Sequence, residues 1–381
     1  MLTIKLFGTL KCFVYICSAR KITAAHVLTC MTNNKKITSK KLIMKKTVIL
    51  SFLFALLFGC ISCDNKQKLP KGVGDFSEKM EAVTKEVEKN KKHDSALLLV
   101  SFGSTCDAPQ QTFKAMKKQF AEKFKDMDVY FSFTSEICIA RCAAKGLNYY
   151  SPSYYLQALG HAGYKTVSVQ SLHVIPGEEY LRVKNVVKDF HNNGDNPEFA
   201  DVTVYLGGPL LYTEQDVETV AQKMHKIYAG EVEAGKVVAL MGHGNPEDAN
   251  YGNGNSRYTM LEEAMQKLNP NYYVATVDMN GNLVTDLIAR MKARGIKEGI
   301  DVICQPLMST AGDHANNDML GGDDEKNAEE GSWRYEFVKA GFNCPITNCH
   351  VVGLGDYPEI VDVWVSHMEE AMKAEPFFGK E

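Results

Sequence analysis

Two stretches of this sequence are each used twice, and this repetition is the feature that most limits how the chain can fold. ALLLVSFG (96–103) aligns with VVALMGHG (237–244), which places Phe102 opposite His243 at a separation of 141 residues. QSLHVIPGEE (170–179) aligns with QPLMSTAGDH (305–314) at a separation of 135 residues. Two matches at nearly the same separation predict an internal duplication.

In the second match, the shared positions carry both backbone and side-chain signals. Gln170 corresponds to Gln305, Gly177 to Gly312, Glu178 to Asp313, and Glu179 to His314. A buried strand pattern therefore ends, in both halves, in a turn that delivers ionisable side chains.

Short apolar runs alternate with helix-period segments from Ser95 onward, which is typical of a parallel sheet whose strands are connected by helices. Thr213 followed by Asp216 resembles a capping box at the start of one of these helices. We predict strands at 95–103, 166–172, 202–210, 236–244, 272–278 and 299–307, and helices at 110–125, 155–162, 213–228, 258–268, 283–293, 333–340 and 358–372.

These elements define an α/β fold with two lobes, each a parallel sheet flanked by helices, related by duplication. We place the N-terminal lobe at 94–232 and the C-terminal lobe at 233–376. Ligands of open parallel sheets bind at the carboxyl ends of the strands. We therefore expect a cleft between the lobes, lined by the loops that follow residues 102, 172, 243 and 308.

The composition is that of a globular protein: the chain has 381 residues, 45% of them hydrophobic and 23% charged. The formal net charge is −3, and no basic cluster is interleaved with aromatic residues. Nucleic acid is therefore excluded as a partner. The sequence leaves a homo-oligomer open.

The amino end resembles an export signal. Residues 1–63 contain no Asp or Glu, and the segment 44–63 has two lysines, an apolar run and then small residues and cysteine. We interpret 44–63 as a lipoprotein-type signal with the lipid on Cys60 or Cys63, which predicts a periplasmic or outer-membrane-associated protein. A plain cleaved signal peptide and a single anchor helix are the alternatives. We interpret 1–43 as an upstream extension that results from a start codon assigned too early.

Between this segment and the first lobe, residues 64–93 are polar and rich in lysine, and we expect a solvated helix or tether there. Cys138 and Cys142 lie on a predicted helix at a spacing that suits neither a zinc knuckle nor an obvious disulfide. We interpret these two cysteines as packing residues.

The loops expected at the cleft carry His173, Glu178 and Glu179 in the first lobe, and His243, Asp313 and His314 in the second. Two imidazoles and a carboxylate form an N,N,O set that suits a borderline divalent ion such as cobalt, iron or zinc. A histidine at a strand end also serves commonly in capping or packing, so both interpretations are kept at this stage.

The segments ALLLVSFGS, VSVQSLHVIPGEEY, VVALMGHG and QPLMSTAGDHANNDM resemble the anaerobic cobalt chelatases that act on sirohydrochlorin in cobalamin synthesis, relatives of the class II chelatases and of ferrochelatase. The resemblance covers about Ala96 to Ala371. It implies a lyase with a two-lobed chelatase-like fold that inserts Co²⁺, or alternatively Fe²⁺, into a tetrapyrrole held between the lobes.

The resemblance also implies roles for individual residues. Glu179, His243 and His314 would hold the metal, and the two histidines would also accept protons from the pyrrole nitrogens. His173 would lie near the macrocycle. The run NPEDANYGNG (245–254) departs from the histidine-bearing loop of the family, which concerns substrate preference more than fold.

Four residues are expected to contact the substrate: Phe102, Ser104, His173 and Met308. Phe102, Val174 and Met308 could form an apolar wall for the ring, although ordinary core packing explains them equally well.

Two further functions are considered beside metal insertion. The export signal favours an exported haem-binding lipoprotein that captures or demetallates haem, because sirohydrochlorin is an intracellular intermediate. A periplasmic metal-binding protein with no tetrapyrrole ligand is the simplest alternative.

Overall fold

The computed structural model describes residues 76–191 and 199–378. Every element described below belongs to one compact unit of the chain. The expectations for the extension at 1–43, for the signal at 44–63 and for lipid on Cys60 or Cys63 lie outside the described residues. Within the described part of the chain, no helix combines the length and the apolar character that crossing a bilayer requires.

Helices and strands alternate along the chain as predicted. The strands are β1 (Ser95–Ser101), β2 (Asp128–Phe133), β3 (Thr166–Ser171), β4 (Thr203–Gly207), β5 (Val237–Gly242), β6 (Tyr272–Thr276) and β7 (Val302–Pro306). The α-helices are α4 (Phe76–Asn90), α5 (Asp107–Lys123), α6 (Glu136–Ala144), α7 (Pro152–His161), α8 (Glu178–His191), α9 (Glu214–Glu233), α10 (Ser256–Leu268), α11 (Val284–Ala293), α12 (Trp333–Lys339) and α13 (Pro358–Lys373). The short helical segments are η3 (Glu247–Ala249), η4 (Tyr251–Asn253), η5 (Ala315–Leu320), η6 (Ile346–Asn348) and η7 (Leu354–Asp356).

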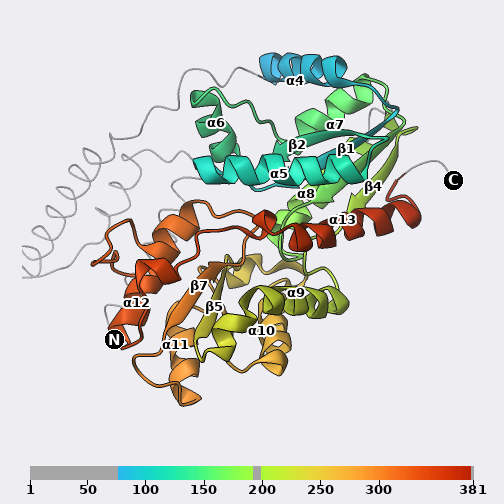
Figure 1. Ribbon diagram of the computed structural model, residues 1–381. Coiled ribbons are helices and arrows are strands. Elements are labelled where there is room, and N and C mark those ends of the chain that lie inside the picture. The colour runs from blue at the N-terminus through green and yellow to red at the C-terminus, as the bar shows by residue number, and fades with distance from the viewer. Residues whose placement is uncertain (1–75, 192–198, 379–381) are drawn as a thin grey trace, which may run out of the picture. The chain divides into compact units, whose positions relative to one another are not determined.

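Two parallel sheets confirm the predicted fold class (Figure 1). The first sheet has the strand order β2-β1-β3-β4 and the second has the order β6-β5-β7. The first three strands of each lobe thus follow the same order, as the duplication requires, and the second sheet has no counterpart of β4 among its named strands. All residues of β5, β6 and β7 are buried, because helices cover both faces of a parallel sheet.

Two glycines that match in the repeat confirm the duplication at the level of the backbone. Gly103 follows β1 with φ of 103°, and Gly244 follows β5 with φ of 79°. This region of φ strongly favours glycine. A Cβ on Gly103 would lie 2.6 Å from the ring of Phe133, and one on Gly244 would lie 2.9 Å from Thr276. Phe133 and Thr276 end the matching strands β2 and β6. In both lobes the turn glycine therefore packs against the last residue of the neighbouring strand.

One helix from each expected lobe packs against the other lobe. The structure therefore differs from the expected division between residues 232 and 233. Helix α9 precedes β5 in sequence and packs against β5 and α10 of the second sheet. Helix α13 ends the chain and packs against β3, β4 and α5 of the first lobe (Figure 1). Trp364 of α13 is fully buried there, and its indole Nε1 donates to the carbonyl oxygen of His173 at 3.2 Å. The predicted capping box at the start of α9 is confirmed: Thr213 and Asp216 hydrogen-bond reciprocally.

The segment expected to be a polar tether contains a helix that contributes to the core. Val83 and Val87 of α4 are fully buried and join the cluster that includes Tyr155 and Leu156 of α7. These two valines are four residues apart, so they lie on one face of the helix. The many lysines and glutamates around them conceal this narrow apolar face in the sequence.

The expected packing role of two cysteines is confirmed. Cys142 is fully buried in the larger core cluster, and Cys138 packs against the same cluster.

The sequence pattern did not identify strand β2 or helix α8 in advance.

Candidate metal centre

Two histidines from different loops of the second lobe meet in space. His243 follows β5 and His314 follows β7, and their ring centroids lie 4.8 Å apart in an edge-to-face arrangement. Both side chains are accessible, with 48% of His243 and 37% of His314 exposed. The parallel pairing of β5 with β7 explains the meeting, because the carboxyl ends of neighbouring parallel strands lie at the same edge.

The hydrogen bonds of these imidazoles determine which nitrogen is available to a ligand. His243 Nδ1 lies 2.7 Å from the carbonyl oxygen of Gly244, which can only accept, so Nδ1 carries the hydrogen. His314 Nδ1 lies 2.6 Å from Asp318 Oδ2, and an ionised carboxylate likewise accepts. In the neutral rings both Nε2 atoms therefore keep a free lone pair, as a metal ligand requires.

Asp318 and Asp278 surround this pair with negative charge. Asp318 fixes the orientation of the His314 ring, and Asp278 Oδ2 lies 3.9 Å from His243 Nε2. Asp318 lies one turn after His314, so the spacing in AGDHANNDM was a signal for this contact. Asp278 follows β6, and no local pattern connects it with His243.

Glu179, the carboxylate expected to complete the ligand set, lies in the first turn of α8. The hydroxyl of Thr134 donates to its Oε2 at 2.9 Å, and Arg182 Nη1 lies 3.5 Å from its Oε1. Arg182 also donates to its neighbour Glu178. Arg182 thus contacts both adjacent carboxylates, and Glu179 in addition accepts from Thr134. The contacts from Thr134 and Arg182 could not be read from the sequence.

His173 lies behind Glu179 and is only 9% exposed. Its Nδ1 is 2.9 Å from the hydroxyl of Ser171, while its buried Nε2 has no hydrogen-bond partner and lies 3.9 Å from Glu179 Oε2. Burial lowers the pKa of His173 to about 4, and the negative charge of Glu179 only partly opposes this effect. His173 is therefore neutral near pH 7. It was expected near the macrocycle, and in the structure it contacts the carboxylate of Glu179.

Two matched glycines allow loops of the two lobes to approach each other closely. A Cβ on Gly177 would lie 2.6 Å from the side chain of Asn245, and a Cβ on Gly312 would lie 2.9 Å from the hydroxyl of Ser104. Gly177 corresponds to Gly312 in the repeat, and Ser104 corresponds to Asn245. Each lobe therefore places its glycine against the equivalent loop of the other lobe, two residues from Glu179 in one case and two residues from His314 in the other.

The residues expected to contact substrate are placed differently from one another. Phe102 is 45% exposed, so its ring is available as an apolar surface. Ser104 is 5% exposed, and its hydroxyl accepts from the backbone N–H of Cys106 at 3.3 Å. Met308 is half-buried against the core of the second lobe, and Val174 is buried in the larger cluster. Of the four, Phe102 is the residue most open to a ligand, and Ser104 forms part of the contact between the lobes.

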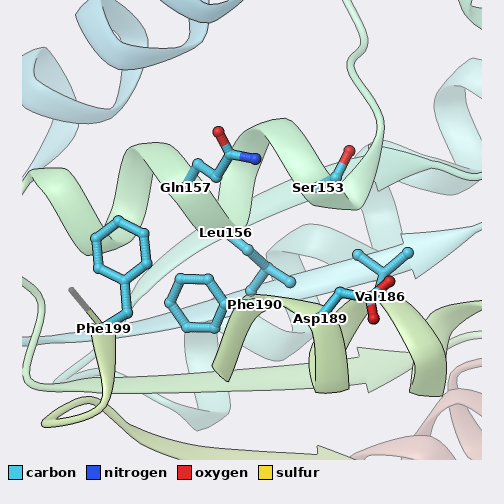
Figure 2. Close-up of a pocket in the computed structure, with 7 residues that line it drawn as sticks. All are labelled: Ser153, Leu156, Gln157, Val186, Asp189, Phe190 and Phe199. Carbon is cyan, nitrogen blue, oxygen red and sulfur yellow. The ribbon is translucent and has the colours of Figure 1, made fainter. Parts of the chain in front are cut away.

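A separate hollow lies on the first lobe between α7 and α8 (Figure 2). Leu156, Phe190 and Phe199 supply its apolar lining, and Ser153, Gln157 and Asp189 supply polar groups. None of the residues lining it belongs to the predicted site. We therefore take the accessible histidine pair, and not this hollow, as the candidate site.

Of the three expected metal ligands, the structure brings together His243 and His314. The contacts of Glu179 are with Thr134, Arg182 and His173. The fold is that of an α/β protein with an accessible pair of imidazoles at the strand ends of its second lobe. The family model "Cobalt chelatase (CbiK)" matches residues 95–373. The chain belongs to this cobalt chelatase family. The resemblance recognised in the sequence is thereby confirmed.

Two relatives cover nearly the same part of the chain. It is 30% identical over 280 residues to the sirohydrochlorin cobaltochelatase CbiKC of Nitratidesulfovibrio vulgaris, covering 73% of this chain and 90% of that protein. It is 32% identical over 279 residues to the sirohydrochlorin cobaltochelatase of Salmonella typhimurium, covering 73% of this chain and 96% of that protein. Among solved structures, SirB from Bacillus subtilis with Fe³⁺ matches with 15% identity and a TM-score of 0.47, covering 73% of this chain and 95% of that one.

Proposed function

We propose that this protein inserts Co²⁺ into sirohydrochlorin, the activity for which both relatives are named. The observation that carries the proposal is the pairing of His243 with His314, each with Nδ1 engaged and Nε2 free. Fe²⁺ is the alternative metal substrate, because imidazole and carboxylate ligands suit both ions.

The reaction requires the ion to lose water, to be held over one face of the ring, and to replace two pyrrole protons. The Nε2 atoms of His243 and His314 would take the place of water ligands, and Glu179 would offset the positive charge. Once the ion passes to the ring, the freed Nε2 atoms would accept the two pyrrole protons, because a neutral imidazole with a free lone pair is a base. Asp318 would stabilise the charged form of His314 as a proton arrives.

The exposed ring of Phe102 would give the tetrapyrrole an apolar surface. In the repeat Phe102 corresponds to His243, so equivalent positions would contact the macrocycle and its metal. The carboxylates of sirohydrochlorin need cationic partners, and Arg182 is the cation closest to Glu179.

Absorbance of sirohydrochlorin during incubation with Co²⁺ and the purified protein tests the proposal. We expect metal insertion by the wild-type chain, and a loss on the order of 100-fold or more in the His243→Ala and His314→Ala variants. Wild-type turnover in either folded variant would show that the site is misplaced. Haem binding without any metal insertion would favour a haem-capturing protein instead.

We also propose that the chain is exported and anchored by lipid on Cys60 or Cys63. The support is the sequence of 44–63, with two lysines, an apolar run and closing cysteines. A chain starting at Met44 should incorporate labelled fatty acid and sediment with membranes, and Cys60→Ser or Cys63→Ser should remove the label. Unlabelled full-length chain in the cytoplasm would overturn this proposal.

A further inference from the structure

Three buried cysteines of the second lobe lie together in space. Cys304 is in the middle of β7, Cys344 follows α12, and Cys349 follows η6. Their exposed fractions are 0%, 2% and 8%, respectively. Their three sulfur atoms all lie within 4.8 Å of one another.

This cluster occupies the edge where the two lobes differ. In the first lobe, β4 pairs with β3 along five consecutive residue pairs, Thr166 with Thr203 through Gln170 with Gly207. In the second lobe the segment that contains Cys344 and Cys349 lies beside β7, and it pairs only through the isolated bridges Asp301 with Asn343 and Cys304 with Cys349. A regular ladder is thus replaced by an irregular segment, and the cysteines lie where the ladder is interrupted.

The sulfur distances fit a shared metal ion better than a disulfide. The sulfur atoms of Cys304 and Cys344 are 3.8 Å apart, and those of Cys344 and Cys349 are 4.0 Å apart. A disulfide bond is about 2.05 Å long. Thiolates bound to zinc at about 2.3 Å in a tetrahedron lie about 3.8 Å from each other. Sulfur atoms in simple packing contact can have a similar separation, so a second observation is needed.

Arg334 supplies that observation. It is only 3% exposed, and its Nη1 is buried with no hydrogen-bond partner. Its Nη2 donates to the carbonyl oxygen of Asp324. The charge of Arg334 acts on both Cys344 and Cys349. Asp324 also interacts electrostatically with Arg334, and three thiolates around one divalent ion would add a net charge of −1, which favours a buried cation.

We propose that Cys304, Cys344 and Cys349 bind a Zn²⁺ ion, or another soft or borderline divalent cation, that fastens the irregular edge segment to β7. Binding releases the thiol protons and leaves one coordination position for a ligand outside the three cysteines. The site is structural and distinct from the substrate-metal site at His243 and His314. Since β7 leads into the loop that carries His314, an ion that fixes β7 would also stabilise the position of that loop.

The first experiment titrates the reduced, metal-free full chain with Co²⁺ as a spectroscopic substitute for zinc. The His243→Ala/His314→Ala variant is used, so that the substrate-metal site does not contribute. We expect an intense thiolate-to-cobalt charge-transfer absorption in the near ultraviolet that saturates at one equivalent and disappears on adding Zn²⁺. Cys344→Ser should abolish this absorption, and Cys142→Ser, which removes a buried thiol outside the cluster, should leave it unchanged. Absence of the absorption in folded protein, or its survival in Cys344→Ser, would overturn the proposal.

A second experiment needs no cysteine substitution and so does not depend on a variant that folds poorly. The alkylation rate of each cysteine in the His243→Ala/His314→Ala chain is measured by mass spectrometry with and without Zn²⁺. We expect Zn²⁺ to slow alkylation of Cys304, Cys344 and Cys349 at least tenfold and to leave Cys142 unaffected. Equal rates, or a disulfide between two of the three cysteines in protein isolated without reductant, would overturn the proposal.

Discussion

The loop after β3 and the loop after β7 occupy equivalent positions in the two lobes, yet they present different chemistry to the site. The first opens helix α8 and presents the carboxylate of Glu179, whereas the second opens the short segment η5 and presents the imidazole of His314. Their anchors are the same. The Nε2 of Gln170 donates to the carbonyl oxygens of Ser171 and Gly208, and the Nε2 of Gln305 donates to those of Pro306 and Val352.

The two loops therefore share their buried glutamine and glycine contacts and differ in their ionisable side chains. The glutamine anchors and the glycine contacts between the lobes are matched in both halves. The ionisable side chains at the matching positions differ, with Glu179 in the first lobe and His314 in the second. Four predictions test how far the two loops remain equivalent, from the largest expected effect to the smallest.

The largest effect is expected at Glu179. We predict that Glu179→Gln lowers kcat/KM for metal insertion by about 100-fold or more, because the amide cannot offset the charge of the incoming ion. Glu178→Gln is the matched control and should remain close to wild type, because Glu179 and not Glu178 is the expected ligand, while Arg182 contacts both carboxylates. Steady-state insertion kinetics measure both. Equal losses in the two variants would show that the first lobe does not supply one particular ligand.

The two glutamine anchors should differ in their contribution to stability. Oε1 of Gln305 accepts from the hydroxyls of Tyr228 and Tyr357, whereas Oε1 of Gln170 is buried with no hydrogen-bond partner. We predict that Gln305→Leu lowers the free energy of unfolding by about 4 kcal/mol and Gln170→Leu by about 2 kcal/mol, because more buried groups lose their partners at Gln305.

Urea unfolding measures these two losses. Adding Tyr228→Phe to Gln305→Leu should recover part of the loss, because it removes one of the orphaned hydroxyls. An equal loss at both glutamines would mean that the unpartnered Oε1 of Gln170 has no energetic consequence.

His173 makes the stability of the protein depend on pH. Met308, at the matching position of the second loop, does not titrate and has no such effect. Burial lowers the pKa of His173 from 6.5 to about 4. The unfolded chain thus binds this proton more readily than the folded chain. The contribution of neutral His173 to stability is complete above pH 6.5 and is lost as the pH falls toward 4.

We predict that His173→Met removes about 3 kcal/mol of the destabilisation between pH 6.5 and pH 4, as measured by urea unfolding across that range. Above pH 7 the difference between variant and wild type should no longer change with pH. An unchanged slope between pH 6.5 and pH 4 would show that His173 is not buried as described.

The smallest effects are expected at the glycines that hold the lobes together. A Cβ on Gly177 would meet Asn245 at 2.6 Å and Ile175 at 3.1 Å, whereas one on Gly312 would meet Ser104 at 2.9 Å. We predict that Gly177→Ala costs about 2 kcal/mol and Gly312→Ala about 1 kcal/mol in the free energy of unfolding, because overpacking displaces short side chains. Asn245→Ala should rescue Gly177→Ala in thermal unfolding, and a lack of rescue would place the strain elsewhere.

Much of the fold and part of the site could be predicted from the sequence, because the signals concerned are local. Apolar runs and helix-period segments predicted six of the seven described strands and the class of the fold. The repeat placed six ionisable residues at the expected cleft, since matched positions at strand ends share a location, and the family resemblance implied Glu179, His243 and His314 among them. The contacts of Asp278 and Thr134 were not predictable in this way, because they join residues that no local spacing relates.

The sequence by itself therefore determined that the chain has two related α/β halves with ionisable residues at their strand ends. Only the tertiary structure decided that α9 and α13 exchange lobes, that Val83 and Val87 of α4 are buried, and that Cys304 meets Cys344 and Cys349. The physical reason is that the periods of helices and strands fix which face of an element is apolar, but not which other element covers it. That choice depends on the path of the whole chain and on the burial that distant segments achieve together.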